Sequence, residues 1–279
     1  MPKVQSTEFP PTMKTETYRI KPKQSVRLND LPTRDDGGFE KKKAEAHFED
    51  LLQRLSDLQE MLHAEAKRSV LVVLQAMDAA GKDSTIRHVF GPLNPQGCKV
   101  HSFKAPTDVE RRHDYLWRIH QRLPERGQIT VFNRSHYEDV LIARVKELVD
   151  KSVWKNRFDH INDFERMITD EGVTVVKFYL HISKDYQKER LQRRLDLPDK
   201  RWKFNPADLL EREHWDDYRG AFEDVFEKCS TEQAPWYIIP AERRWYRNLL
   251  VATVMVETLE RLKMSFPPVT FEPWKIEIP

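Results

Sequence analysis

The sequence has few of the features that mark secreted, membrane-bound or zinc-binding proteins. Only two of its 279 residues are cysteines, Cys98 and Cys229, which is too few for a disulfide framework or a zinc site. Its apolar runs are no longer than a strand, so no segment is predicted to span a membrane. The first residues have no apolar signal-peptide core, and we therefore expect a cytoplasmic protein with two free thiols.

Excess charge of one sign is also missing. The chain has 47 basic and 45 acidic residues, a net charge of +2, and 39% of its residues are hydrophobic. A protein that binds nucleic acid through its overall charge would be far more basic. We therefore predict neither nucleic acid nor a membrane as a partner, and enough apolar residues for a sizeable core.

Three sequence motifs of common enzyme classes are absent. No G-x-G-x-x-G follows the first predicted strand, which argues against a dinucleotide-binding fold. The lack of an Asn-Lys-x-Asp element argues against a guanine-selective GTPase. Without a G-x-S-x-G elbow, a serine hydrolase is not expected either.

The most informative segment that is present runs from Val70 to Lys82. Five consecutive apolar residues, Val70 to Leu74, predict a strand buried on both faces, and small residues ending in Gly-Lys follow it. A strand, a small-residue loop, Gly-Lys and a helix together are typical of a phosphate-binding loop, in which backbone N–H groups and a lysine surround an anion. The predicted phosphate contacts are Ala79, Ala80, Gly81, Lys82, Asp83 and Ser84.

This loop departs from the usual G-x-x-x-x-G-K-[ST] pattern. Ala76 replaces the first glycine, and Asp83 stands where a magnesium-binding hydroxyl normally follows the lysine. Asp78 adds a carboxylate to a loop that binds anions. A carboxylate there is most easily explained if a divalent cation lies between it and the phosphate.

Strands and helices alternate from Val70 onward, which predicts an α/β fold with a parallel sheet and helices on both faces. A leucine-rich pattern before it predicts an amphipathic helix over residues 39–68. We expect a proline-rich extended arm before that helix, with a short strand at Tyr18–Ile20, on the domain surface or on a neighbouring subunit. The predicted strands are 70–75, 99–104, 128–132, 173–181 and 235–239. The later predicted helices are 82–91, 108–122, 136–149, 156–171, 184–195, 206–228 and 242–263.

The strand at residues 128–132 leads into a second polar segment. Asn133 stands at its end, where nucleotide-binding folds place a metal-organising acid, and Arg134 can bind phosphate oxygens in bidentate fashion. Glu138 and Asp139 follow about one helical turn later, near the same crevice. The alternative is an ordinary strand-to-helix connection with solvated charges.

A third segment, Lys184 to Lys203, concentrates positive charge in a nearly neutral chain. Arg190, Arg193 and Arg194, with Arg201 further on, can lie on one side of a helix and its following turn. Such a segment is typical of a lid whose arginines close over a polyanion, although a solvated basic helix is the simpler alternative. A second basic run over residues 111–126 is expected to lie mostly on the surface.

Several strings in the chain resemble the polyphosphate kinase 2 family. They appear in order over nearly all of residues 15–265: QAMDAAGKDSTIRHVFGPLNPQG (75–97), FKAPT (103–107), YLWRIH (115–120), VFNRSHYEDVL (131–141), FERM (164–167), HISK (181–184), KRWKF (200–204), APWYIIPA (234–241) and WYRN (245–248). FNRSHYED and NPQG resemble the one-domain branch that accepts AMP as well as ADP. Other branches carry Asp-Arg-Ser where this chain has Asn133, so we assign that residue no aspartate-like metal role.

The resemblance implies a P-loop kinase fold of the thymidylate-kinase type. This is a three-layer αβα sandwich with a five-stranded parallel sheet and a helical lid at about residues 184–205. The implied divisions are an arm and amphipathic helix over 1–68, the kinase domain over 69–265 and a tail over 266–279. The resemblance also implies Mg²⁺, with Mn²⁺ as the alternative, and a homo-oligomer, either a dimer or a tetramer.

The activity implied by the resemblance is reversible transfer of the terminal phosphoryl group of inorganic polyphosphate to AMP or ADP. The partners would be polyphosphate and adenine nucleotides, with other purine nucleotides as further candidates. We expect Asp78 and Glu138 to hold metal or acceptor. The residues expected to stabilise the transferring phosphoryl group are Lys82, Arg134, Arg193 and Arg194. Phosphate or nucleotide contacts are expected of Asn133, Arg190 and Lys203.

Two other hypotheses fit the same residues. One is a nucleoside monophosphate kinase that uses ATP as the donor. The other is a non-catalytic, nucleotide-binding regulatory protein, suggested by Ala76, Asp83 and Asn133. Phosphorylation of AMP by polyphosphate without ATP would exclude both.

Overall fold

A five-stranded parallel sheet forms the centre of the protein. The computed structural model describes residues 13–278, so the first twelve residues of the predicted arm and Pro279 of the predicted tail lie outside the described residues. The sheet order is β2-β3-β1-β4-β5, and each neighbouring pair is parallel. The strands are β1 (Ser69–Ala76), β2 (Cys98–Ser102), β3 (Ile129–Asn133), β4 (Val173–His181) and β5 (Trp236–Pro240). All five predicted strands and the predicted α/β class are therefore confirmed.

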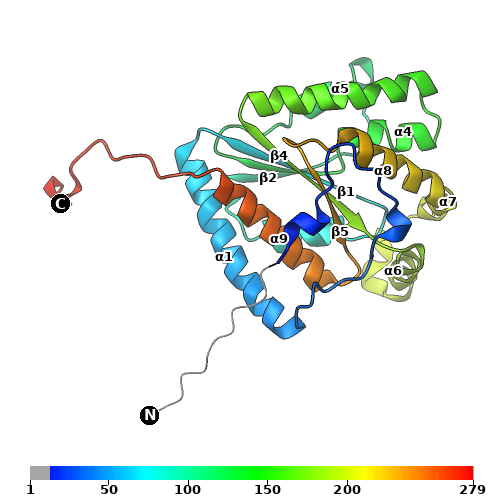
Figure 1. Ribbon diagram of the computed structural model, residues 1–279, viewed down its shortest axis with the longest axis horizontal. Helices are drawn as coiled ribbons and strands as arrows, with labels where there is room; N and C mark the ends of the chain where they lie inside the picture. The colour runs from blue at the N-terminus through cyan, green and yellow to red at the C-terminus, as the bar shows by residue number, and fades with distance from the viewer. Residues whose placement is uncertain (1–12, 279) are drawn as a thin grey trace, which may run out of the picture.

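Helices cover both faces of the sheet, which makes three layers (Figure 1). α1 (Lys41–Glu65) and α9 (Arg244–Arg261) pack together on one face. α5 (Lys151–Asp170) and α8 (Trp215–Cys229) pack together on the other. The remaining helices are short or lie at the edge: α2 (Lys82–Thr85), α3 (Trp117–His120), α4 (Ile142–Val145), α6 (Lys184–Asp196) and α7 (Ala207–Glu213).

Burial explains why the strongest sequence patterns formed the predicted elements. Val70 to Leu74 of β1 are fully buried, as expected of a central strand covered by helices on both faces. The leucine stripe of α1 is buried through Leu51, Leu55, Leu58 and Leu62, and it faces α9 in the core. Because the loop that follows β1 continues directly from this buried strand, it starts from a rigid support.

The register of the strands aligns their carboxyl ends. Leu74 of β1 lies beside Asn133 of β3, and Asn133 lies beside Ser102 of β2. The loops after these three strands therefore leave the same edge of the sheet, which is where ligands of open α/β sheets bind.

Several predicted helices are shorter or broken. The predicted helix 108–122 is wrong as a single element: the segment holds a 3-10 turn at Glu110–Arg112 and the short α3. Between them the Asp114 side chain accepts a hydrogen bond from Leu116 N–H at 2.9 Å, a local bond that competes with helix. The predicted helix 206–228 is interrupted at His214, which separates α7 from α8.

Two further predicted helices are irregular at the edge of the site. The segment predicted as helix 82–91 is α2 followed by a π-helical turn over Ile86–Phe90. The segment predicted as helix 136–149 contains only a 3-10 turn over His136–Asp139 and α4. Its chain then bends at Glu147, whose φ of 52° lies in the left-handed region and ends the helix.

The described part of the arm packs on its own chain. The predicted strand at Tyr18–Ile20 is wrong, because a 3-10 helix (Thr15–Tyr18) is followed by a single antiparallel bridge between Arg19 and Tyr237. Ile20 N–H donates to Trp236 O at 2.8 Å, and Leu28 is 1% exposed. The sequence left open whether the arm lies on its own domain or on a neighbouring subunit. Residues 13–37 lie on their own domain.

The chain after α9 runs away from the body of the protein (Figure 1). Between α9 and residue 278 its only regular structure is a 3-10 turn at Pro273–Lys275. Phe266, Trp274 and Ile278 are exposed along it. Over residues 13–278 no helix is both long enough and apolar enough to cross a membrane.

Candidate functional site

The loop after β1 has the backbone expected of an anion-binding turn. Ala79 has a φ of +63° and Gly81 a φ of +107°, and α2 begins at the next residue. A Cβ atom at Gly81 would lie 2.2 Å from Nη1 of Arg247, so glycine is required here for space as well as for its φ. The first helical hydrogen bond runs from Thr85 N–H to Gly81 O at 2.9 Å, which leaves the preceding N–H groups to other acceptors.

Lys82 lies among polar groups and not in an apolar interior. Its ammonium group donates to Ala76 O at 3.0 Å and lies 4.0 Å from Oδ1 of Asp78. Burial lowers the pKa of Lys82, and the charge of Asp78 opposes that shift. The Lys82 side chain also lines the large basic cavity described below.

Asp78 and Arg134 form an ion pair in front of this loop. Nη2 of Arg134 donates to Oδ1 of Asp78 at 2.8 Å. Burial by itself would raise the pKa of Asp78, but the charges of Lys82 and Arg134 hold it below its usual value. The carboxylate is therefore ionised at neutral pH, as the sequence predicts for a group that binds a cation or orients phosphate.

Arg134 reaches this position through an unusual backbone conformation. Its φ is +62°, in the left-handed region that non-glycine residues seldom adopt, and its N–H donates to Leu74 O at 3.1 Å. The neighbouring Asn133 donates from Nδ2 to Oδ1 of Asp83 at 2.8 Å. Asn133 and Asp83 are two residues that depart from the usual motifs, and they are thus hydrogen-bonded to each other.

A basic cavity of about 650 Å³ opens above the loop. Ten basic side chains but only two acidic ones, Asp78 and Asp83, line it. The basic residues come from α2 and the π-helical turn after it, from the segments after β2 and β3, from α6 with the turn that follows it, and from the start of α9. They are Lys82, Arg87, Lys104, Arg134, Arg190, Arg193, Arg194, Lys200, Lys203 and Arg244. This excess of positive charge suits a ligand with many negative charges.

The predicted lid arginines of α6 do not all have the same surroundings. Arg190 and Arg193 line the basic cavity and form no ion pair within residues 13–278. Arg194 also lines it, but its guanidinium donates to Asp208 at 3.1 Å and to Lys203 O at 3.2 Å. Arg201 does not belong to the cavity and donates to Leu195 O at 2.8 Å. The expected cluster of four arginines is therefore a cluster of three.

A smaller cavity of about 210 Å³ lies beside the basic one and has a different character. Glu138, Asp208 and Glu211 supply carboxylates, and Trp215, Tyr218 and Phe222 supply aromatic surface. Burial raises the pKa of Glu138 against the opposing charges of Arg134 and Lys82. Asp78 and Arg134 line both cavities, so the ion pair marks the boundary between them.

Asp78 and Glu138 are the residues here that could hold a divalent metal ion. Within residues 13–278 no cluster of three or more metal-binding side chains occurs. Asp78 and Glu138 nevertheless line the same cavity, and Asp78 is ionised. Mg²⁺ in phosphoryl-transfer sites usually takes one or two carboxylates and fills its remaining positions with water and phosphate oxygens.

Two side chains that the sequence reasoning did not assign hold the loop in place. Arg247 of α9 is buried behind the loop, where it donates to Ser84 Oγ at 3.2 Å. Burial lowers its pKa to about 10. Gln187 of α6 donates to Asp78 O at 2.9 Å and so ties the loop to α6. Arg247 lies in the WYRN string, but nothing in its spacing indicated that it would contact the loop.

Comparison with known proteins gives consistent matches over most of the chain. The family model described as Polyphosphate kinase 2 (PPK2) matches residues 38–267. An AMP/ADP-polyphosphate phosphotransferase of Meiothermus ruber is 54% identical over 252 residues, which make up 90% of this chain and 94% of the relative. An ADP-polyphosphate phosphotransferase of Rhodopseudomonas palustris is 46% identical over 274 residues, 92% of this chain and 94% of the relative. The crystal structure of polyphosphate kinase 2 from Arthrobacter aurescens TC1 has a TM-score of 0.89 at 42% identity and 92% coverage of both chains.

Proposed function

Because the chain belongs to the polyphosphate kinase 2 family, we propose that it passes the terminal phosphoryl group of polyphosphate to AMP and to ADP. The observation that carries this proposal is the pair of unlike cavities that share Asp78 and Arg134. The basic cavity suits a chain of phosphates, and the smaller aromatic and acidic cavity suits a nucleoside. The transferred group would cross at the shared ion pair.

Each site residue has a proposed role in this transfer. Lys82 and the backbone N–H groups of Ala79, Ala80, Gly81, Asp83 and Ser84 bind the transferring phosphoryl group. Arg134, Arg193 and Arg194 neutralise the charge that spreads over its oxygens, while Arg190 and Lys203 hold the polyphosphate chain. Asn133 supports the loop through Asp83. We propose residues 69–265 as the kinase domain, with about 184–205 as its lid.

Asp78 and Glu138 are the proposed ligands for Mg²⁺ or Mn²⁺. A bound divalent ion supplies charge compensation between the donor and acceptor phosphates. Asp78 remains ionised for this purpose, and Gln187 fixes its backbone. Chelation of divalent ions is expected to abolish transfer and added Mg²⁺ to restore it.

The experiment that tests the function is nucleotide separation after mixing the protein with Mg²⁺, long polyphosphate and AMP, without ATP. ADP and then ATP are the expected products. Transfer that appears only when ATP is added would indicate a conventional nucleoside monophosphate kinase instead. Nucleotide binding without any turnover would indicate a regulatory protein.

Glu138 is the proposed determinant of acceptor choice, because it lies in the smaller cavity next to the ion pair. Glu138→Asn should reduce kcat/KM with AMP about ten-fold more than it reduces kcat/KM with ADP. Initial rates with each acceptor measure this, and the exposed Glu49→Asn on α1 serves as the control. Equal losses for AMP and ADP would contradict the assignment.

We also propose a cytoplasmic location and self-association into a dimer or tetramer. Nucleotide substrates and the two free cysteines suit a reducing compartment. The exposed apolar residues after α9 offer surface for contact between chains. Light scattering on the purified protein would give a monomer mass if the association is wrong.

A further inference from the structure

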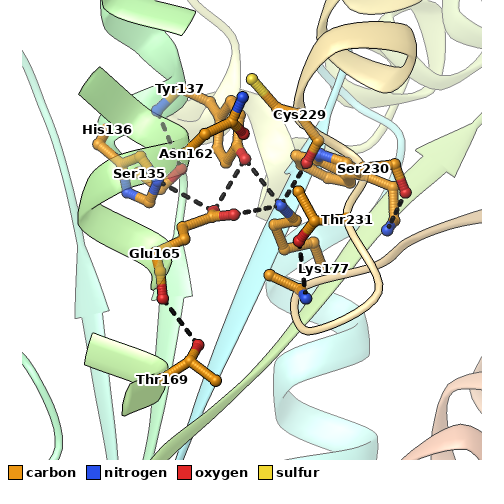
Figure 2. Close-up of polar contacts among 12 residues, drawn as sticks. Ser135, His136, Tyr137, Asn162, Glu165, Thr169, Lys177, Cys229, Ser230 and Thr231 are labelled. Carbon is orange, nitrogen blue, oxygen red and sulfur yellow. Dashed lines mark hydrogen bonds and ion pairs between the residues drawn. The ribbon is translucent and has the colours of Figure 1, made fainter. Parts of the chain in front are cut away.

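An ion pair lies in the core, away from both cavities. Glu165 of α5 and Lys177 of β4 are 2% and 0% exposed, and Nζ of Lys177 lies 2.5 Å from Oε2 of Glu165 (Figure 2). A buried ion pair is often no more stabilising than an apolar pair of the same size. Its presence in the core therefore calls for another explanation.

The pair is bound to the segment that follows β3. Tyr137 donates its hydroxyl proton to Oε1 of Glu165 at 2.8 Å and accepts from Lys177 Nζ at 2.9 Å (Figure 2). Lys177 gives its third proton to Cys229 O at 2.7 Å, so its three donors are satisfied. Nε2 of His136 lies 3.3 Å from Oε1 of Glu165.

The protonation states make these bonds directional. Burial alone would raise the pKa of Glu165, but Lys177 and His136 hold it below its usual value, so it is a carboxylate. Because Glu165 can only accept and the Lys177 ammonium can only donate, the Tyr137 hydroxyl has one arrangement that satisfies both of these neighbours.

In the sequence, Tyr137 lies between Arg134 and Glu138, the two site residues to which the proposed function gives a role in the transfer. Arg134, with its left-handed backbone, precedes it, and Glu138 follows it directly. Ser135 Oγ accepts from Tyr137 N–H at 3.2 Å and from Gln75 Nε2 at 3.3 Å, which ties the same turn to β1. The backbone between Arg134 and Glu138 is thus held both by the strand and by the buried ion pair.

We propose that Tyr137, Glu165 and Lys177 are positioning residues that fix the 3-10 turn His136–Asp139 and thereby aim Arg134 and Glu138 at the boundary between the two cavities. The inference rests on the proposed roles of those two residues in phosphoryl transfer. Buried hydrogen bonds with fixed donors and acceptors specify one arrangement more strictly than apolar contacts do. A displacement of about 1 Å at a reacting group can cost about 10²-fold in rate.

Tyr137→Phe tests the proposal with the least disturbance, because it removes only the hydroxyl from a buried ring. We expect kcat to fall by about ten-fold or more. Tyr179→Phe on β4 is the matched control, since Tyr179 is also buried, and its hydroxyl makes no hydrogen bond within residues 13–278. The control should keep the wild-type kcat.

A double-mutant cycle with Arg134→Ala separates positioning from a general loss of stability. If Tyr137 acts through Arg134, Tyr137→Phe should lower kcat much less, by about two-fold or less, once Arg134 is already alanine. Equal fold-losses in both backgrounds would overturn the proposal, as would wild-type kcat in Tyr137→Phe. A wild-type rate in Arg134→Ala itself would instead reject the proposed role of Arg134, and the inference with it.

The ion pair is tested by a variant that removes both charges together. A single substitution at Glu165 or Lys177 strands a buried charge and can prevent folding. Glu165→Met with Lys177→Met keeps a similar volume, and we expect a folded protein whose kcat falls as in Tyr137→Phe. Hydrogen exchange of residues 134–139 should become faster in the folded variant. Unchanged exchange and kcat would overturn the role of the pair.

Discussion

Lys82 lies where the end of β1, the left-handed Gly81 and the start of α2 meet. Its ammonium group is held by Ala76 O and lies near Asp78, which keeps it beside the basic cavity instead of in solvent. Preorganised charge of this kind needs no reorientation when the phosphoryl group arrives, and removing one such donor typically costs about 10²–10³-fold in rate.

Replacement of Lys82 should therefore reduce turnover without unfolding the protein. Lys82→Met is expected to lower kcat by about 10²–10³-fold while Tm changes little. Steady-state rates with polyphosphate and ADP, together with a thermal melt, measure the two effects. Lys155→Met on α5, an exposed lysine, is the matched control. A Lys82 variant with wild-type kcat would contradict the role of its ammonium group.

The buried carboxyl group of Asp139 makes the stability of the folded protein depend on pH. Burial raises its pKa from 3.8 to about 6, against the opposing charges of Arg157 and Arg118. As the pH rises, the unfolded chain loses this proton before the folded chain does, so stability falls between about pH 4 and 6. Asp139→Asn cannot ionise and should escape that loss.

The free energy of unfolding of Asp139→Asn, relative to wild type, should therefore increase by up to about 3 kcal/mol from pH 4 to pH 7. Urea unfolding at half-unit intervals measures the difference. A difference that stays constant over this range, or that decreases, would show that the carboxyl group does not titrate as described.

Among the elements, α6 supplies the most basic side chains to the basic cavity. Ser183 caps its N-terminus by accepting from Tyr186 N–H at 3.1 Å, and Gln187 bonds to the loop through Asp78 O. Arg190 and Arg193 then project into the cavity, while Arg194 is held by Asp208. The helix thus combines one face that anchors it with one that is free to bind anions.

Arg193→Ala should weaken binding of polyphosphate more than it affects the nucleotide. We expect KM for polyphosphate to rise by about ten-fold and the rate to become less sensitive to salt, because one phosphate-binding charge is lost. Lys188→Ala is the matched control, since it removes the same charge from the exposed side of α6. Identical salt profiles for Arg193→Ala and wild type would argue against a lid that binds the polyanion.

Helix α1 packs along α9 on one face of the sheet. Leu55 is fully buried where α1 meets α9. Leu55→Ala should lower the free energy of unfolding by about 2–5 kcal/mol, because it leaves a cavity that neighbours fill only in part. Denaturant unfolding measures this, with the exposed Glu49→Ala as control. A loss below about 1 kcal/mol would mean that α1 is packed more loosely than described.

For the molecule as a whole, the sequence was most informative where its pattern is periodic or its backbone is constrained. All five strands were predicted, because continuous apolar runs such as Val70 to Leu74 have little alternative to a buried strand. Gly81 and Lys82 indicated the anion-binding loop, and the loop forms with the left-handed glycine that such a turn requires. The roles of the site residues remain predictions.

Contacts between distant segments could not be predicted. Arg247 and Ser84 are 163 residues apart, yet they meet behind the loop, and no local pattern encodes such a contact. The same holds for the ion pair between Arg194 and Asp208, which gives one arginine of the basic cavity an acidic partner that its own segment does not supply. The predicted helix 108–122 failed for a local reason, because the Asp114 side chain competes with the helical hydrogen bonds.

The most direct test of the two-cavity account is a crystal structure with a short polyphosphate and an acceptor nucleotide bound together. The account predicts phosphates along the basic cavity beside Lys82, Arg190 and Arg193, with the nucleoside in the smaller cavity near Glu138 and Tyr218. The terminal phosphate and the acceptor phosphate should meet at Asp78 and Arg134. A nucleotide in the basic cavity, or polyphosphate bound away from α6, would contradict it.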